Sequence, residues 1–109
     1  MHVLAQLEQT IVDRKNAADA GKSYTARLLA GGVPKISEKV IEEAHEVVEA
    51  AGEPGDEGRV HLIREAADVV YHLLVLLASR DASLLEVEQE LARRFGMSGL
   101  EEKASRPQN

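Results

Sequence analysis

The pattern of apolar and polar positions along the 109-residue chain predicts a succession of α-helices. Apolar residues recur every three or four positions in five segments, which is the period of a helix with one buried face. No segment shows the strict alternation that is typical of a strand. We therefore expect an all-α fold, a bundle of four to five helices, over residues 2–20, 24–30, 34–52, 59–79 and 83–95.

Local signals mark where several of these helices begin and end. Ser23 is expected to cap the second helix, and the pair Gly31 and Gly32 is expected to end it. Ser83, with Glu86 three residues later, forms the capping-box pattern of a helix start. These signals predict short connections between neighbouring helices.

Two stretches are expected to lie outside the helices. The segment GEPGDEG, residues 52–58, is rich in Gly, Pro and acid, and we expect a loop there. Residues 96–109 carry few apolar side chains and are expected to form a loosely ordered tail. The length fits one domain, residues 1–109, whose core spans about residues 3–95.

The segment 59–79 is apolar almost all round, which is typical of a helix that is buried on most sides. A chain this short can hardly surround such a helix alone, so we expect a subunit interface and a homodimer or higher homo-oligomer. The polar residues of this helix form one stripe, with spacings of four, three and four residues: His61, Glu65, Asp68 and His72.

Composition narrows the classes of function. The net charge of −6 argues against a nucleic-acid partner, whose binding surface is usually basic. The absence of cysteine excludes disulfides, thiolate metal sites and thiol catalysis. The longest apolar run, residues 69–78, is interrupted by His72 and is too short to span a bilayer. With no signal peptide in evidence, we expect a cytoplasmic protein without a membrane partner.

Two acidic turns carry the candidate chemistry. EEAHE contains Glu43 and Glu46, and EAAD contains Glu65 and Asp68, each pair at the three-residue spacing of helical neighbours. If the two helices pack antiparallel, the pairs face each other, with Glu42 bordering them. Four carboxylates in one place suit a hard cation, Mg²⁺ or Mn²⁺, which would offset their repulsion.

Each part of this pattern also has a simpler interpretation. The glutamates of EEAHE can be a solvated helix face, and Glu65 and Asp68 can be ion-paired with Lys39 or Arg64. Spacing alone leaves metal binding and ion pairing open. His72, in an apolar run, is more typical of a hydrogen-bonded core histidine than of a metal ligand.

Basic residues lie near the acidic helix and in the tail. Arg27, Lys35 and Lys39 precede EEAHE, and Lys103 and Arg106 follow the last helix. Basic groups beside carboxylate-bound Mg²⁺ indicate a polyphosphate substrate, although each one taken singly is ordinary surface charge.

Four segments resemble one known family. SYTARLLAGG, KISEKVIEEAHEVVEAA, EAADVVYHLLVLLASR and SGLEEKASR are similar to the phosphoribosyl-ATP pyrophosphohydrolases, the enzymes of the second step of histidine biosynthesis. The resemblance runs from about residue 23 to residue 106. The spacing E-x-x-E followed by E-x-x-D is generic to the wider MazG-like all-α nucleotide pyrophosphohydrolases, whereas the other segments are specific to this family.

The resemblance implies hydrolysis of 1-(5-phosphoribosyl)-ATP to 1-(5-phosphoribosyl)-AMP and pyrophosphate, with Mg²⁺, in a MazG-like bundle completed by dimerisation. Glu43 and Glu46 are the implied catalytic groups that orient water. The implied metal ligands are Glu43, Glu46, Glu65, Asp68 and the adjoining Glu42. The implied substrate-binding residues are Tyr24, Arg27, Lys35, Lys39, Lys103 and Arg106. Ile41 departs from the small residue that many relatives have there.

Two other functions compete with this one. A housecleaning enzyme of the same architecture would hydrolyse a free nucleoside triphosphate with Mg²⁺. A non-catalytic helical dimer module would keep the apolar helix but would have no need of Glu65 and Asp68 on it.

Overall fold

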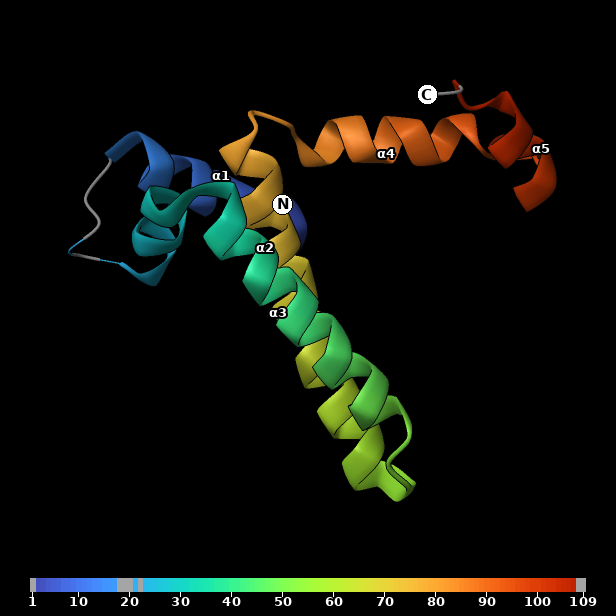
Figure 1. Cartoon of the computed structure of the whole chain (residues 1–109), viewed down its shortest axis with the longest axis horizontal. Coiled ribbons are helices and arrows are strands. Elements are labelled where there is room, and N and C mark those ends of the chain that lie inside the picture. The colour runs from blue at the N-terminus through green and yellow to red at the C-terminus, as the bar shows by residue number, and fades with distance from the viewer. Residues whose placement is uncertain (1, 18–20, 22, 108–109) are drawn as a thin grey trace.

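The computed structural model describes residues 2–17, 21 and 23–107. Over these residues the chain forms α-helices and no strand, which confirms the all-α prediction. Residues 18–20 of the first predicted helix and the last two residues of the predicted tail lie outside the described residues. In chain order the helices are α1 (Val3–Ala17), α2 (Tyr24–Ala51), α3 (Gly55–Ser79), α4 (Leu84–Arg93) and α5 (Gly99–Ser105), as shown in Figure 1.

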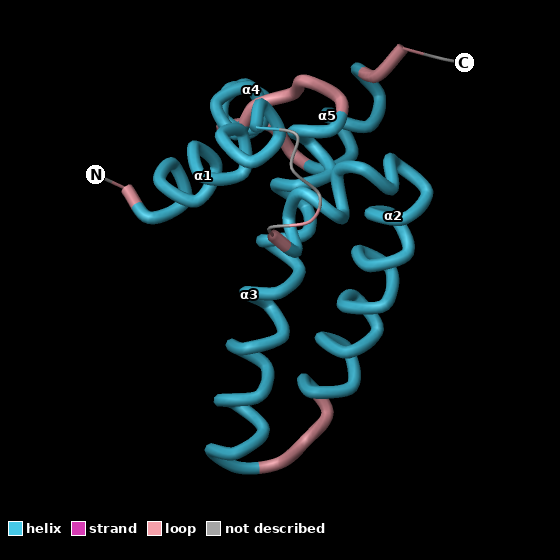
Figure 2. Tube along the Cα trace, turned by 90° about the vertical axis from the view of Figure 1, so that its left-hand side faces the viewer, coloured by secondary structure: helices cyan, strands magenta, loops and turns pink. Residues whose placement is uncertain are grey.

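Residues 33–51 of α2 and the helix α3 form a long antiparallel hairpin (Figure 2). The side chain of Ser23 accepts a hydrogen bond from the Ala26 N–H at 2.9 Å, so the predicted cap is present. Gly32 leaves the helical conformation, with φ 76° and ψ −174°, and Pro34 follows it. The predicted division between residues 24–30 and 34–52 is thus a break inside α2.

The helix α3 begins four residues before its predicted start, and the expected loop shrinks to residues 52–54. Asp56 and Glu57 lie in its first turn, where negative charge favours the positive end of the helix dipole. A Cβ atom on Gly58 would lie 2.3 Å from the backbone oxygen of Glu53, so this close approach requires glycine. The loop prediction was wrong because it counted Gly55 and Gly58 as helix breakers, although both lie inside α3.

The core lies at the end of the hairpin opposite this turn, where α1 packs across α2 and α3 (Figure 1). The Lys15 ammonium donates to the Ala78 carbonyl at 2.7 Å, and the Glu8 carboxylate accepts from the Leu84 N–H at 2.6 Å. These polar contacts fix α1 to the last turn of α3 and to the start of α4. The buried residues of this core cluster are Ile11, Leu28, Ile36, Leu74, Val75 and Ala78.

The helices α4 and α5 extend away from the hairpin as an arm, which we define as residues 84–105 (Figure 1). Both hydrogen bonds of the predicted capping box between Ser83 and Glu86 are present. The apolar spacing of Leu84, Val87, Leu91 and Phe95 predicts one buried face for this helix, but within one chain Phe95 is 81% exposed and Leu91 is 50% exposed. Only the start of α4 reaches the core, through Leu84.

The tail is more ordered than expected, because α5 forms within it. The Ser98 side chain caps α5 by accepting from the Glu101 N–H at 3.0 Å. Glu102 is only 6% exposed and pairs with Arg106 at 2.7 Å and with Arg94 at 3.5 Å. Charged contacts therefore attach α5 to the end of α4.

The expectation that α3 is buried on most sides is not met within one chain. A stripe of its apolar residues remains exposed, with Ile63 at 54%. We call this stripe the α3 apolar face, and it consists of Val60, Ile63, Val70 and Leu73. Among the described residues, no helix is long and apolar enough to cross a membrane.

Candidate active site

Three carboxylates from the hairpin converge on one point. Glu43, Glu46 and Glu65 each offer an oxygen, and these oxygens lie within 4.8 Å of one another. We call these three residues the carboxylate cluster. Glu43 and Glu46 lie three positions apart on one face of α2, and the antiparallel packing of α3 brings Glu65 opposite them. All three side chains belong to half-buried residues.

The other two predicted metal ligands lie at the border of this cluster. Asp68 is exposed and outside the group of three, yet its charge contributes to raising the pKa of Glu43. Glu42 is exposed, and its carboxylate lies 3.6 Å from the Lys39 ammonium. The structure thus brings together three of the five acids that the sequence indicated.

The electrostatics of the cluster favour a bound cation. Burial, followed by a hydrogen bond with Glu65 and the charge of Glu46, raises the pKa of Glu43 to about 7. One oxygen of Glu43 and one of Glu65 are buried without a hydrogen-bond partner. Protonated Glu43 can share its proton with Glu65, whereas two ionised carboxylates have no donor between them. Buried, unpartnered carboxylate oxygens fit a hard divalent ion, which would supply the missing positive charge.

The ion pairs around the cluster differ from those that the sequence suggested, in which Lys39 or Arg64 would pair with Glu65. Among the described ion pairs, Lys39 contacts Glu42 and neither Lys39 nor Arg64 contacts Glu65. Instead the other oxygen of Glu65 lies 3.3 Å from His61 Nε2. A hydrogen bond with Glu53, at 2.9 Å from His61 Nδ1, is the main cause that raises the pKa of His61. Glu65 is therefore only partly compensated by protein groups.

His72 is a buried, hydrogen-bonded histidine, as expected. Its Nδ1 lies 2.9 Å from the Asp68 carbonyl oxygen, and its Nε2 lies 3.1 Å from the Tyr24 hydroxyl. Next to this pair, the hydroxyls of Thr25 and Tyr71 are also hydrogen-bonded. Sequence reasoning missed these contacts, because the break at Gly32, and not the register of the antiparallel hairpin, brings Tyr24 and Thr25 to His72 and Tyr71.

Comparison with known proteins identifies the family of the chain. The family model described as phosphoribosyl-ATP pyrophosphohydrolase matches residues 4–95. A phosphoribosyl-ATP pyrophosphatase of Dinoroseobacter shibae is 57% identical over 97% of this chain and 100% of its own. The proteins of that name from Erythrobacter litoralis and Rhodopirellula baltica are 54% and 56% identical, over 97% and 78% of this chain and 98% and 71% of their own.

The chain belongs to the phosphoribosyl-ATP pyrophosphohydrolase family. The resemblance seen in the sequence is thereby confirmed. In this member of the family, the carboxylate cluster occupies the positions of the E-x-x-E pair and the first acid of E-x-x-D.

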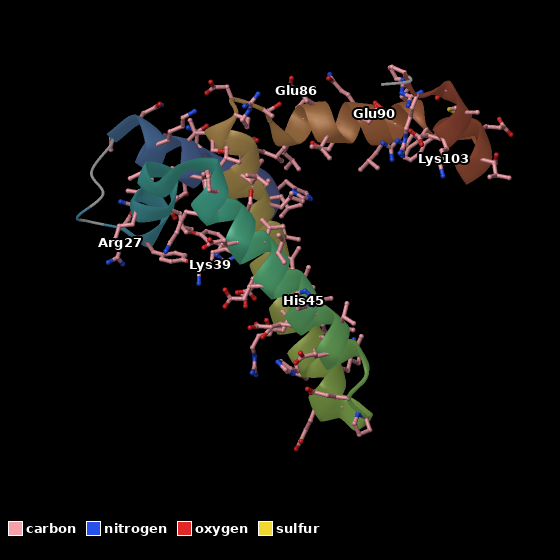
Figure 3. All side chains as sticks on the ribbon, viewed as in Figure 1. Arg27, Lys39, His45, Glu86, Glu90 and Lys103 are labelled. Carbon is pink, nitrogen blue, oxygen red and sulfur yellow. The ribbon has the colours of Figure 1, made fainter. Side chains whose placement is uncertain are left out.

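The predicted substrate-binding residues of this phosphoribosyl-ATP pyrophosphohydrolase family member fall into two groups. Arg27 and Lys39 lie on the same side of the hairpin (Figure 3). The charges of Lys39, Glu43 and Glu42 all influence the pKa of Tyr24, which burial raises above its usual value. Tyr24 and Lys39 are therefore neighbours of the carboxylate cluster, and the exposed Lys35 lies one turn before Lys39.

The tail residues form the second group, and within one chain they are remote from the cluster. Lys103 lies at the far end of the arm, well away from Arg27 and Lys39 (Figure 3). Arg106 is hydrogen-bonded to Glu102, which holds the pKa of the Glu102 carboxyl below its usual value. Arg106 thus has a structural partner of its own in α5.

Proposed function

We propose that this protein is a cytoplasmic hydrolase that converts 1-(5-phosphoribosyl)-ATP and water into 1-(5-phosphoribosyl)-AMP and pyrophosphate, the second step of histidine biosynthesis. Membership of the phosphoribosyl-ATP pyrophosphohydrolase family supports this reaction. The observation that carries the proposal is the carboxylate cluster, whose buried oxygens lack protein partners at the place where this family's acidic motif falls.

Glu43, Glu46 and Glu65 would hold the metal ion, with Asp68 and Glu42 completing its surroundings at the border. Carboxylate oxygens without nitrogen or sulfur ligands favour Mg²⁺, and Mn²⁺ suits the same donors. The bound ion would neutralise charge on the phosphate oxygens and on the departing pyrophosphate.

The side chains of the cluster also have a role toward water. In the proposed reaction a water oxygen attacks the α-phosphorus, the α–β anhydride bond breaks, and the bridging oxygen leaves with pyrophosphate. A carboxylate of the pair Glu43 and Glu46 orients this water and takes its proton. Lys39, Arg27, Lys35 and Tyr24, beside or near the cluster, bind the phosphates and the nucleoside.

We further propose that the protein works as a homodimer. The α3 apolar face and the apolar side chains of the arm, such as Phe95 and Leu100, are exposed in one chain and need a partner. A second copy offers the same apolar surfaces, so a two-fold interface would cover both faces at once. A partner's arm could then bring its own Lys103 to the neighbouring site.

The test is pyrophosphate release from phosphoribosyl-ATP measured beside ATP, dUTP and dCTP, at saturating Mg²⁺ and again with Mn²⁺. We expect preference for phosphoribosyl-ATP, expressed as kcat/KM, and saturable dependence on the metal ion. Preference for a free nucleotide would identify a housecleaning pyrophosphohydrolase instead. Absence of hydrolysis with any of these substrates would favour the non-catalytic dimer module.

A further inference from the structure

Beside the carboxylate cluster lies a second polar group, of which the proposed reaction so far uses only Tyr24. Tyr24 and Thr25 of α2 meet Tyr71 and His72 of α3, and we call these four residues the tyrosine–histidine group. The Tyr24 and Tyr71 rings stack with centroids 6.3 Å apart, and the His72 ring meets the Tyr71 ring edge-on at 5.0 Å. These ring contacts fix the position of the Tyr24 phenol on the hairpin.

The hydrogen bonds of His72 fix its tautomer. The Asp68 carbonyl oxygen, 2.9 Å from Nδ1, can only accept, so Nδ1 must carry a proton. In a neutral imidazole, Nε2 is then an acceptor. The atom 3.1 Å from Nε2 is the Tyr24 hydroxyl oxygen, which must therefore donate its proton to His72. The single proton of Tyr24 is committed inside the protein.

A phenol whose proton is committed presents only its lone pairs to the outside. Tyr24 is 43% exposed, whereas His72 is only 6% exposed, so Tyr24 is the member of this pair that a ligand can reach. Its hydroxyl can accept a hydrogen bond but cannot donate one to a phosphate oxygen. The neighbouring Glu42 and Glu43 carboxylates also disfavour phosphate at this point, and they raise the pKa of the Tyr24 phenol.

We propose that His72 is a positioning residue that holds the Tyr24 hydroxyl as a hydrogen-bond acceptor for a ribose hydroxyl of the substrate. This inference rests on the proposed function, because it takes phosphoribosyl-ATP as the ligand of the carboxylate cluster. The adenosine ribose is joined to the reacting α-phosphate through its 5′-oxygen, so its hydroxyls lie a few bonds from the metal-bound phosphates. The triphosphate offers acceptors, and the ribose offers the O–H donors that Tyr24 requires.

The tautomer is tested without any measurement of activity. Long-range ¹H–¹⁵N spectra of the wild-type protein distinguish a protonated ring nitrogen from an unprotonated one, and His72→Gln identifies which signals belong to His72. We expect a protonated Nδ1 and an unprotonated Nε2, and we expect the Nε2 signal to shift in Tyr24→Phe. A protonated Nε2 in the neutral ring would overturn the proposal, because Tyr24 would then be free to donate.

The ligand is tested by deleting the two ends of the predicted hydrogen bond. We expect Tyr24→Phe to raise the KM for phosphoribosyl-ATP about three- to tenfold, with the Mg²⁺ concentration for half-maximal rate unchanged. With the wild-type enzyme, the analogue that lacks the contacted 2′- or 3′-hydroxyl of the adenosine ribose should show a similar rise in KM. With Tyr24→Phe that analogue should show no further rise in KM, because the contact is already absent. If the rise in KM from Tyr24→Phe and the rise from the missing hydroxyl multiply for both analogues, the proposal is overturned.

Two variants separate positioning from general stability. Tyr71→Phe removes the other phenol of the tyrosine–histidine group and should leave the KM within about twofold, since Tyr71 is hydrogen-bonded to Thr25 and not to His72. His72→Phe keeps a ring but loses both nitrogens, and it should raise the KM as much as Tyr24→Phe does. An unchanged KM in His72→Phe would contradict the positioning role. A wild-type protein that hydrolyses no phosphoribosyl-ATP would instead refute the proposed function, and the imidazole spectra would still test the tautomer.

Discussion

The acids of the hairpin differ from one another because of their surroundings. Glu43 of α2 and Glu65 of α3 each keep a buried oxygen without a partner, whereas Glu42 and Glu49, which share α2 with Glu43, are exposed to water. A carboxylate in water is satisfied by solvent, but a buried one needs a proton, a donor or a cation. The chemistry at the residue scale therefore follows from a difference in burial along a single helix.

The first prediction concerns turnover. Replacing Glu46 or Glu65 by glutamine should reduce kcat at least about a hundredfold, because electrostatic contacts to a reacting centre typically contribute on that scale. Steady-state pyrophosphate release at several Mg²⁺ concentrations measures it. A variant that has lost a metal ligand needs more Mg²⁺ for half-maximal rate, while one that has lost only the water-orienting group has a lower kcat at unchanged Mg²⁺ demand. The matched control is Glu49→Gln, and a normal kcat in both site variants would refute their role.

The second prediction concerns stability and pH in the metal-free protein. The folded-state pKa of Glu43 is about 7 against an ordinary 4.5, so the protonated form favours folding. Its stabilising contribution is fully present below about 4.5 and is lost as the pH rises through about 7. Urea unfolding in EDTA should show this loss in the wild-type protein and not in Glu43→Gln. Mg²⁺ should restore wild-type stability more at pH 8 than at pH 5, and equal pH dependence in the two proteins would contradict the expectation.

At the residue scale the sequence indicated the cluster only in part. Helical spacing was enough to place Glu43 and Glu46 on one face and Glu42 toward solvent. It could not separate Glu65 from Asp68, because three residues along a helix rotate a side chain by about 60° from its neighbour. Only the crossing of α2 and α3 decides which of those two acids points between the helices.

At the scale of single helices, caps and glycines set the boundaries. Ser23 and Ser83 were readable as caps because their partners, Ala26 and Glu86, lie three residues further on. The start of α3 was not readable, because Gly55 and Gly58 in sequence indicate a loop. The structure gives each glycine a local reason: Gly55 has a positive φ of 72°, and at Gly58 the backbone of Glu53 approaches too closely for any side chain.

The third prediction follows from that close approach. Gly58→Ala should lower the free energy of unfolding by about 1–3 kcal/mol, because the added methyl group forces the turn apart. The change is measured by urea unfolding monitored by circular dichroism. Gly99→Ala is the matched control, since an added Cβ at Gly99 has no atom within 4 Å, and it should change stability by less than about 0.5 kcal/mol. Equal effects at the two positions would show that the turn relaxes freely.

For the whole molecule, the exposed apolar surface is the main feature. The core inside one chain lies at one end of the hairpin, while the α3 apolar face and the arm carry large uncovered side chains. The sequence predicted an apolar helix that one chain cannot surround. It did not predict that α4 leaves the bundle, because the apolar period of α4 is the same whichever chain it packs against.

The fourth prediction concerns assembly. Introducing a charge into the α3 apolar face with Ile63→Glu should convert the protein from two chains to one in analytical ultracentrifugation, because an unpaired buried carboxylate opposes association. Val3→Glu is the control, since Val3 is 73% exposed but lies on α1, outside that face, and this variant should keep the wild-type mass. A wild-type protein that sediments as a single chain at micromolar concentration would contradict the dimer.

The break at Gly32 has a consequence for how the two polar groups of the hairpin can change. Gly32 leaves the helical conformation, so the directions of the side chains before Gly32 do not fix the directions of those from Val33 onward. Tyr24 lies before this joint, and the acids of the carboxylate cluster lie after it. A small rotation of residues 24–31 therefore need not turn Glu43 or Glu46 about the helix axis. Tyr24 and the acids of the carboxylate cluster therefore belong to two helical segments of α2, separated by the break at Gly32, and the position of one can change without the other.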